Sequence, residues 1–235
     1  MLVAAAVCPC PPLLVPEVAG GAASEMNDAR EACYDALGVL AAARPDRLVV
    51  VGPADQAGRG THPEGARGSF RGFGVGLDVT LGSGEPAQRE LPPSLAVGAW
   101  LLERTKWRAA PVEGLGVGEP LSRERCTAAG AQLARDTDRL ALLVMGDGSN
   151  CRTLKAPGYF DDRAIAFDTE AGRALGSADT GALLALDEEL AYELNVSGRS
   201  SWHVLAGAAE GAGLDGRLLY EDAPYGVGYL VASWT

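Results

Sequence analysis

The sequence has little positive charge. Its 235 residues include 20 lysines and arginines against 31 aspartates and glutamates, which gives a formal net charge of −11 at pH 7. Proteins that attract nucleic acid or an anionic lipid surface need a basic face. The composition therefore argues against nucleic acid and against a membrane surface as partners.

Cysteine patterns and long hydrophobic runs are also missing. The five cysteines are an odd number, with neither zinc-knuckle spacing nor the density of a disulfide framework. No stretch approaches the roughly 20 apolar residues of a membrane span. No Lys or Arg precedes the apolar N-terminal run, as it would in a secretory signal. We therefore expect a cytoplasmic protein with reduced thiols.

Continuous apolar runs at residues 2–7, 48–52 and 140–145 predict strands that are buried on both faces. Residues 22–44 separate the first two runs and carry apolar side chains at three- and four-residue spacing, which predicts a helix capped by Ser24. The order strand, helix, strand is typical of a parallel sheet.

The rest of the chain predicts further elements of both kinds. They are strands at 75–81, 112–117, 218–221 and 227–234, and helices near 95–102, 119–133, 161–175, 179–194 and 200–212. Hydrophobic residues make up 47% of the chain, enough for one core. We therefore predict a single α/β domain over residues 1–235, with a mainly parallel central sheet flanked by helices on both faces.

Two turns follow predicted strands at the edge where open α/β sheets bind ligands. Residues 8–12 read Cys-Pro-Cys-Pro-Pro, and residues 146–152 read Gly-Asp-Gly-Ser-Asn-Cys-Arg. The second turn is not a phosphate-binding P-loop, because the Gly-Lys-Ser/Thr ending is absent. Cys8 and Cys10 are placed where chemistry could occur, although buried thiols also pack as small hydrophobic groups.

The chain has only two histidines. His62 lies in a Gly-rich segment, residues 53–76, that shows no periodicity and that we interpret as a functional or mobile loop. His203 lies in a predicted helix far from either turn, where we interpret it as a surface or packing residue. His62 is therefore the imidazole that could reach a site at the sheet edge.

Four stretches together resemble the class III extradiol ring-cleavage dioxygenases of the LigB type and their Memo-like relatives. They are residues 4–17 (AAAVCPCPPLLVPE), 49–53 (VVVGP), 145–150 (MGDGSN) and 223–229 (APYGVGY). The resemblance implies an α/β sheet that carries Fe(II) on two histidines and one carboxylate, binds a catechol beside O₂, and uses a further histidine as acid and base. Such a facial triad leaves open coordination positions on the iron.

The positions that match the family's functional histidines hold other residues. The two metal ligands fall on Cys10 and Ala54, and the acid/base histidine falls on Asn150. Glu221 or Asp222 could supply the carboxylate. Alanine binds no metal, and asparagine has no titratable proton near neutral pH. The resemblance therefore implies a degenerate metal site, and we expect no iron cofactor.

Four hypotheses remain open. We favour a divergent member that has lost iron-dependent catechol cleavage and keeps the pocket to bind a small molecule, aromatic by resemblance. The second is an active dioxygenase with altered ligands, including His62. The third is an enzyme of different chemistry that uses Cys10, Asp147 and Cys151. The fourth is a thiolate site for Zn or Cu(I) on Cys8, Cys10 and Cys151.

The candidate catalytic residues in this cleft are Cys10, Asp147 and Asn150. We expect Ser149, Cys151, Glu221 and His62 to line the same pocket, because they follow neighbouring strands or lie in the loop beside them. An arginine such as Arg152 beside Cys10 would lower the pKa of its thiol. The sequence indicates neither the ligand nor the oligomeric state, and a homo-oligomer stays open.

Overall fold

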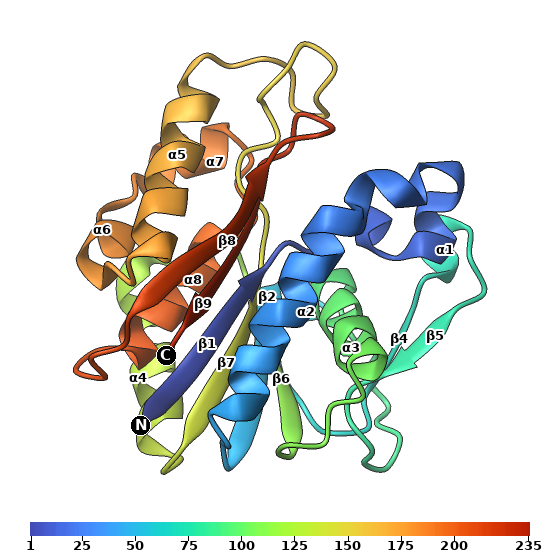
Figure 1. Ribbon diagram of the computed structural model, residues 1–235, viewed down its shortest axis with the longest axis vertical. Coiled ribbons are helices and arrows are strands. Elements are labelled where there is room, and N and C mark those ends of the chain that lie inside the picture. Colours follow the sequence, from blue (N-terminus) through green and yellow to red (C-terminus); the bar gives the residue numbers. More distant parts are fainter.

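Seven strands form one sheet in the order β3-β6-β2-β7-β1-β9-β8 (Figure 1). The computed structural model describes all residues from 1 to 235. The strands of the sheet are β1 (Leu2–Cys8), β2 (Arg47–Pro53), β3 (Gly60–His62), β6 (Val112–Val117), β7 (Leu140–Met145), β8 (Gly216–Asp222) and β9 (Tyr229–Trp234). A separate two-stranded sheet pairs β4 (Arg67–Ser69) with β5 (Asp78–Thr80).

The four central strands β6, β2, β7 and β1 run parallel. Strands β3 and β9 run antiparallel to their neighbours, so the sheet as a whole is mixed. The predicted α/β class and the parallel centre are confirmed. The C-terminal pair differs from the parallel strands because a short turn joins β8 to β9, and such a turn can connect only antiparallel strands.

The helices are α1 (Pro16–Ala19), α2 (Asn27–Ala42), α3 (Pro93–Arg104), α4 (Arg123–Arg135), α5 (Arg163–Gly176), α6 (Thr180–Ala185), α7 (Glu188–Glu193) and α8 (Arg199–Ala208). Helices α2 and α3 lie on one side of the sheet, and α4, α5 and α8 lie on the other (Figure 1). None of the helices has the length and hydropathy of a membrane span.

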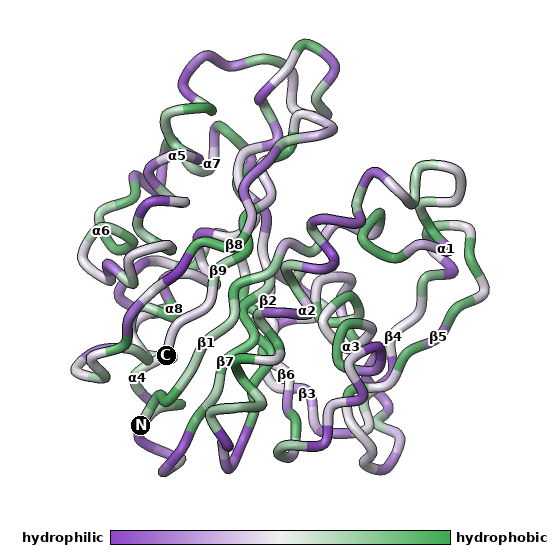
Figure 2. Tube along the Cα trace, viewed as in Figure 1, coloured by the Kyte–Doolittle hydropathy of each residue, from purple (hydrophilic) through white to green (hydrophobic).

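Strand β1 is buried on both faces of the sheet. Successive side chains of a strand point to opposite faces. Ala4, Ala6 and Cys8 accordingly pack in one cluster with residues of α2 and α3, whereas Ala5 and Val7 pack in a second with residues of α5 and α8. Figure 2 shows the same hydrophobic centre through β1, β2 and β7. The small alanines let helices approach the central strand closely from either side.

Three predicted elements differ from the observed ones. The helix predicted at 22–44 begins as a 3₁₀ helix (Gly20–Met26) and becomes α2 only at Asn27. Ser24 does not cap it, because Met26 is the N-cap residue of α2. The buried guanidinium of Arg30 donates to the Ala23 carbonyl oxygen and to Asn27 Oδ1 at this start. The helix predicted at 179–194 is two short helices, each capped by an aspartate. Residues 53–76, expected to lack structure, contain β3, β4 and a 3₁₀ turn.

Helices α4 and α8 pack closely at Gly130, which gives a stability prediction. A Cβ at Gly130 would overlap the Val204 carbonyl oxygen and lie 2.7 Å from the Ala208 nitrogen. We expect Gly130→Ala to destabilise the fold by about 1–3 kcal/mol, since overpacking forces backbone shifts. Gly38→Ala is the matched control in α2, where nothing lies within 4 Å of the added carbon. It should stabilise by about 0.5–1 kcal/mol in urea unfolding. Equal effects of the two changes would contradict this packing.

Candidate functional site

A cleft of about 470 Å³ opens at the carboxyl edge of the sheet. Its walls come from the turns after β1, β2 and β6 and from the start of α3. The residues that line it are Cys10, Pro53, Ala54, Asp55, Arg59, Pro93, Ser94, Glu119 and Pro120. Cys10 and Ala54, which match the family's two metal-binding histidines, thus lie in one cleft, as the positions of their strands predict.

Proline shapes the cleft. Pro53 ends β2 and Pro93 begins α3, a position where the missing N–H of proline costs no helical hydrogen bond. The Ser94 hydroxyl donates to the Pro53 carbonyl oxygen at 2.6 Å, which ties the start of α3 to the turn after β2. The wall of the cleft is therefore fixed by a short hydrogen bond between two rigid turns.

Asp147 follows β7 and is held against the turn after β1, beside the backbone of Cys10, but it is not among the residues that line the cleft. Its Oδ1 accepts the backbone N–H of Cys10 at 2.8 Å, and its own backbone N–H donates to Ser197 Oγ at 3.3 Å. Burial raises the pKa of the Asp147 carboxyl to about 7, and the Cys10 N–H opposes this shift. A carboxyl that titrates near neutral pH can donate or accept a proton there.

Glu119 and Asp55 are the two carboxyl residues that line the cleft. Glu119 follows β6, and its Oε1 accepts the Ser200 hydroxyl at 2.7 Å. Burial raises the pKa of Glu119, while Ser200 and Arg199 act in the opposite direction. Glu119 is not among the site residues predicted from the sequence. Its position just after a parallel strand, like those of Cys10 and Asp147, could have indicated that it lies at this edge of the sheet.

Cys10 is not an activated nucleophile. Its side chain is 8% exposed, and burial raises the pKa of its thiol well above the ordinary value. The charges of Asp147 and Glu119 raise this pKa further. Arg152 does not approach the thiol but pairs with Asp168 at 3.1 Å. The geometry therefore favours the protonated thiol and contradicts the idea that an arginine activates it.

Ser149 is buried in a structural network rather than in the cleft. Its backbone N–H and its hydroxyl both donate to the carboxylate of Asp168 on α5, each at 2.7 Å. Gly148 and Gly228 press against the same carboxylate, where a Cβ would collide with its oxygens. Arg152 supplies the countercharge. The pocket prediction was wrong for Ser149, because Asp168 draws it toward α5.

Asn150 and Cys151 face the segment that follows them. Asn150 Oδ1 lies 3.3 Å from Cys151 Sγ, and the thiol also contacts the carbonyl oxygens of Gly158 at 3.4 Å and Leu194 at 3.6 Å. Neither residue lines the cleft at Cys10. The predicted grouping of Asn150 and Cys151 with Cys10 is therefore wrong, since the Cys151 thiol contacts Asn150, Gly158 and Leu194 instead.

His62 is fixed and buried, not carried on a loose loop. It lies on β3, and its Nε2 is 2.8 Å from both the Gly58 carbonyl oxygen and Arg89 Nη2. Its Nδ1 is buried without a partner. Burial lowers the pKa of His62. The expectation that His62 lines the pocket is wrong, because pairing of β3 with β6 holds it behind the cleft.

Glu221 and Asp222 lie at the sheet edge away from the cleft. Both are exposed on β8, the outermost strand, and Glu221 approaches Gly172 of α5. Strand β9 separates them from β1. The expectation that Glu221 joins Cys10 in one pocket is therefore wrong. His203, by contrast, is a packing residue, buried on α8 with its Nε2 3.0 Å from the Leu183 carbonyl oxygen.

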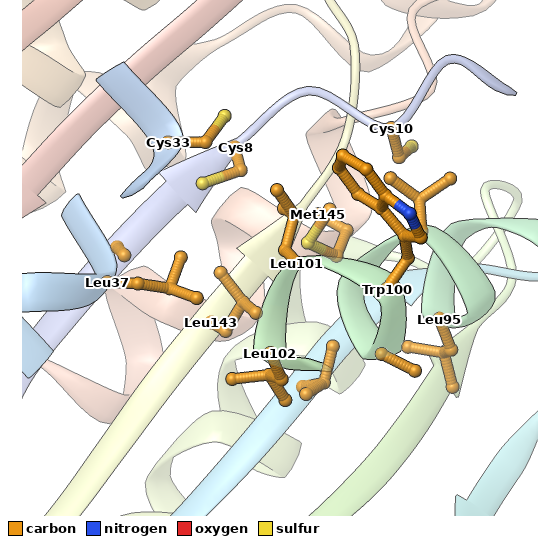
Figure 3. Packing of buried hydrophobic residues seen from close by; sticks show 14 of the residues in the cluster. Cys8, Cys10, Cys33, Leu37, Leu95, Trp100, Leu101, Leu102, Leu143 and Met145 are labelled. Atoms are coloured by element: carbon orange, nitrogen blue, oxygen red, sulfur yellow. The ribbon is translucent and has the colours of Figure 1, made fainter. Parts of the chain in front are cut away.

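The thiols of Cys8, Cys10 and Cys151 do not form one group. Figure 3 shows Cys8 beside Cys33 of α2, while Cys10 lies apart, near Trp100 of α3. Burial and the neighbouring Cys33 raise the pKa of the Cys8 thiol. The structure brings together no group of three His, Cys, Asp or Glu side chains arranged to hold a metal ion.

A second cavity of about 740 Å³ adjoins the cleft and shares Glu119 and Pro120 with it. Its other wall is α7 with the segment that follows, including Glu188, Glu189 and Glu193. The carboxyl edge of the sheet thus carries two neighbouring cavities, and Glu119 lines both of them.

Comparison with known proteins supports the fold. No family model and no curated protein matches the chain. Solved structures do match. Among them is the crystal structure of the uncharacterized protein JW3007 from Escherichia coli K12, with a TM-score of 0.53, 16% sequence identity and 99% of each chain covered. At this identity the similarity shows a shared α/β fold and nothing about activity.

The raised pKa of Asp147 predicts a pH-dependent stability. The folded chain binds more protons than the unfolded chain between pH 3.8 and about 7, so this carboxyl makes stability fall as pH rises through that range. We expect Asp147→Asn to stabilise the fold at pH 8 by up to about 4 kcal/mol and to have little effect near pH 4. Urea unfolding at both pH values measures this. The control is Asp136→Asn, which removes an exposed carboxyl at the C-terminus of α4. If Asp147→Asn stabilised the fold equally at both pH values, the raised pKa of Asp147 would be contradicted.

The same carboxyls predict the reactivity of Cys10. Asp147→Asn or Glu119→Gln removes a negative charge that raises the pKa of the thiol, so each should accelerate alkylation of Cys10 by iodoacetamide at pH 8. Peptide mass spectrometry gives the rate, with Cys33 of the same sample as the internal reference. Asp136→Asn should leave the rate unchanged. If neither cleft variant reacts faster than the parent chain, the three groups are not electrostatically coupled.

Proposed function

We propose that this chain is a LigB-like protein that binds a small aromatic molecule in the cleft at Cys10 and Ala54 and does not cleave catechols with iron. The observation that carries the proposal is that these two positions, which match the family's metal ligands, line one cleft without offering a metal site. Ala54 has no ligand atom, and the Cys10 thiol is kept protonated. The five free cysteines fit a reducing, cytoplasmic location.

The shape of the cleft supports an aromatic ligand. Pro53, Ala54, Pro93 and Pro120 supply apolar wall, and polar groups stand at its base and rim. Pockets with an apolar lining and a few fixed polar groups are typical of small-molecule sites. At about 470 Å³ the cleft has room for a single ring with substituents.

A second candidate is an enzyme that transfers protons at the edge of the cleft, where Asp147 lies beside the Cys10 backbone. The specific observation in its favour is Asp147, whose carboxyl is fixed by the Cys10 N–H and has a pKa of about 7. In this hypothesis Asp147 replaces the acid/base histidine that Asn150 cannot replace. An activity abolished by Asp147→Asn, with ligand affinity retained, would favour this candidate.

Catechol and Fe(II) together test the main proposal. We expect catechol to bind with and without added Fe(II), measured by calorimetry under nitrogen, and no yellow ring-opened product to form in air. Ala54→Phe should abolish binding because its ring fills the cleft, whereas Ala42→Phe, on the exposed end of α2 at the opposite edge of the sheet, should not. Thermal unfolding verifies that both variants fold. Ring-opened product that depends on Fe(II), or binding unaffected by Ala54→Phe, would overturn the proposal.

A further inference from the structure

Seven large hydrophobic residues of the chain are exposed to solvent, and four of them lie within twelve consecutive positions. Leu154 is 81% exposed, Tyr159 is 78% exposed, and Phe160 and Ile165 are each 49% exposed. These four residues form what we call the tip patch. Single exposed hydrophobic residues are normal on a protein surface, whereas several of them gathered in one short segment indicate an interaction site.

The tip patch lies at one end of the molecule, on the segment between β7 and α5 and on the first turn of α5 (Figure 1). This segment packs against the turn between β8 and β9, where the Arg152 N–H donates to the Gly226 carbonyl oxygen at 3.0 Å. A Cβ at Gly226 would lie 2.5 Å from Ala156 Cβ. None of the four patch residues lines the cleft at Cys10 or the larger cavity beside it.

Backbone hydrogen bonds close this segment on itself. The Gly158 N–H donates to the Asn150 carbonyl oxygen at 3.0 Å, and the Asp161 N–H donates to the Cys151 carbonyl oxygen at 3.0 Å. A Cβ at Gly158 would overlap Asn150 Oδ1, so only glycine permits this close approach. Tyr159 has a φ of +66°, which an aromatic residue rarely adopts. A fixed loop therefore presents the apolar side chains, which lowers the entropy cost of binding.

The exposed area of the tip patch matches what a stable dimer needs. From their exposed fractions, the four residues present on the order of 500 Å² of surface. A standard interface buries about 800 Å² on each partner, of which about 60% is apolar. The patch alone thus supplies the apolar share of one side of such an interface.

The charge of the surrounding segment favours a second copy of this chain as the partner. Residues 151–165 carry three positive and two negative side chains, which gives +1, whereas the whole chain has a net charge of −11. Two copies of so acidic a chain repel each other over most of their surface. A contact through the tip patch brings only near-neutral surfaces together, and it lets the exposed Lys155 of one copy pair with the exposed Asp162 of the other.

We infer that the tip patch is the interface of a homodimer, in which the same four residues of two copies pack together about a two-fold axis. A two-fold contact needs a self-complementary surface. The patch meets this need, because it has an apolar centre and charges of both signs around it. The inference goes beyond the proposed function and is independent of it, since no patch residue lines the cleft.

Sedimentation velocity of the full chain over a range of concentrations tests the inference, and we expect a reversible equilibrium between monomer and dimer. Leu154→Asp and Tyr159→Asn should each raise the dissociation constant at least about tenfold. Asparagine tolerates a positive φ, so Tyr159→Asn removes the aromatic ring and keeps the loop conformation. The matched control is Phe73→Asn, which removes an exposed aromatic ring outside the patch and should leave the dissociation constant unchanged.

Lys155→Glu separates the effect of charge from an effect on folding. It makes the segment negative in both copies, so the dimer should weaken at low salt and recover at high salt, where repulsion between exposed charges is screened. Thermal unfolding verifies that every variant folds. A parent chain that stays monomeric at high micromolar concentration would overturn the inference and leave the patch to a different partner. A dimer that Leu154→Asp and Tyr159→Asn both leave intact would also overturn it, because the contact would then lie elsewhere.

Discussion

The pairing of β1 with β7 is the constraint on which the site depends. The two strands are parallel and pair in continuous register from Ala4–Ala141 to Cys8–Met145, and the Gly146 N–H donates to the Cys8 carbonyl oxygen at 3.0 Å. Parallel strands that end together bring their following turns together. The hydrogen bond from the Cys10 N–H to Asp147 is the direct consequence, and it holds in place the turn that carries Cys10 into the cleft.

The turn after β7 is held from its other side by α5. Asp168 accepts two hydrogen bonds from Ser149 and forms an ion pair with Arg152. Its carboxylate also packs against Gly148 and Gly228. A fully satisfied buried network rigidifies what it connects. It links the turn after β7 to the start of β9, so that Asp147 is presented by a rigid turn and Asn150 is directed away from the cleft.

The electrostatics of the site follow from burial without a countercharge. The carboxyls of Asp147 and Glu119 both have a raised pKa. Their negative charges in turn raise the pKa of the Cys10 thiol. The triad of two histidines and one carboxylate that the resemblance implies would hold a positive metal at this position, whereas this chain has a protonated thiol at Cys10 and no ligand atom at Ala54. The chemistry of the cleft therefore follows from these residues, because function belongs to the site and not to the fold.

The sequence by itself determined the central strands and the edge of the sheet where the site lies. Three apolar runs bounded by Gly and Pro specified β1, β2 and β7, since continuous hydrophobic strands are stable only when buried on both faces. Cys10, Ala54 and Asp147 could be placed at one edge for that reason. The directions of side chains were decided only by tertiary contacts. Ser149 donates a hydrogen bond to Asp168, and the Cys151 thiol contacts the Gly158 carbonyl oxygen. His62 is held by the pairing of β3 with β6. Those partners lie up to tens of residues away in the chain, and local sequence patterns carry no record of such long-range hydrogen bonds and strand pairs.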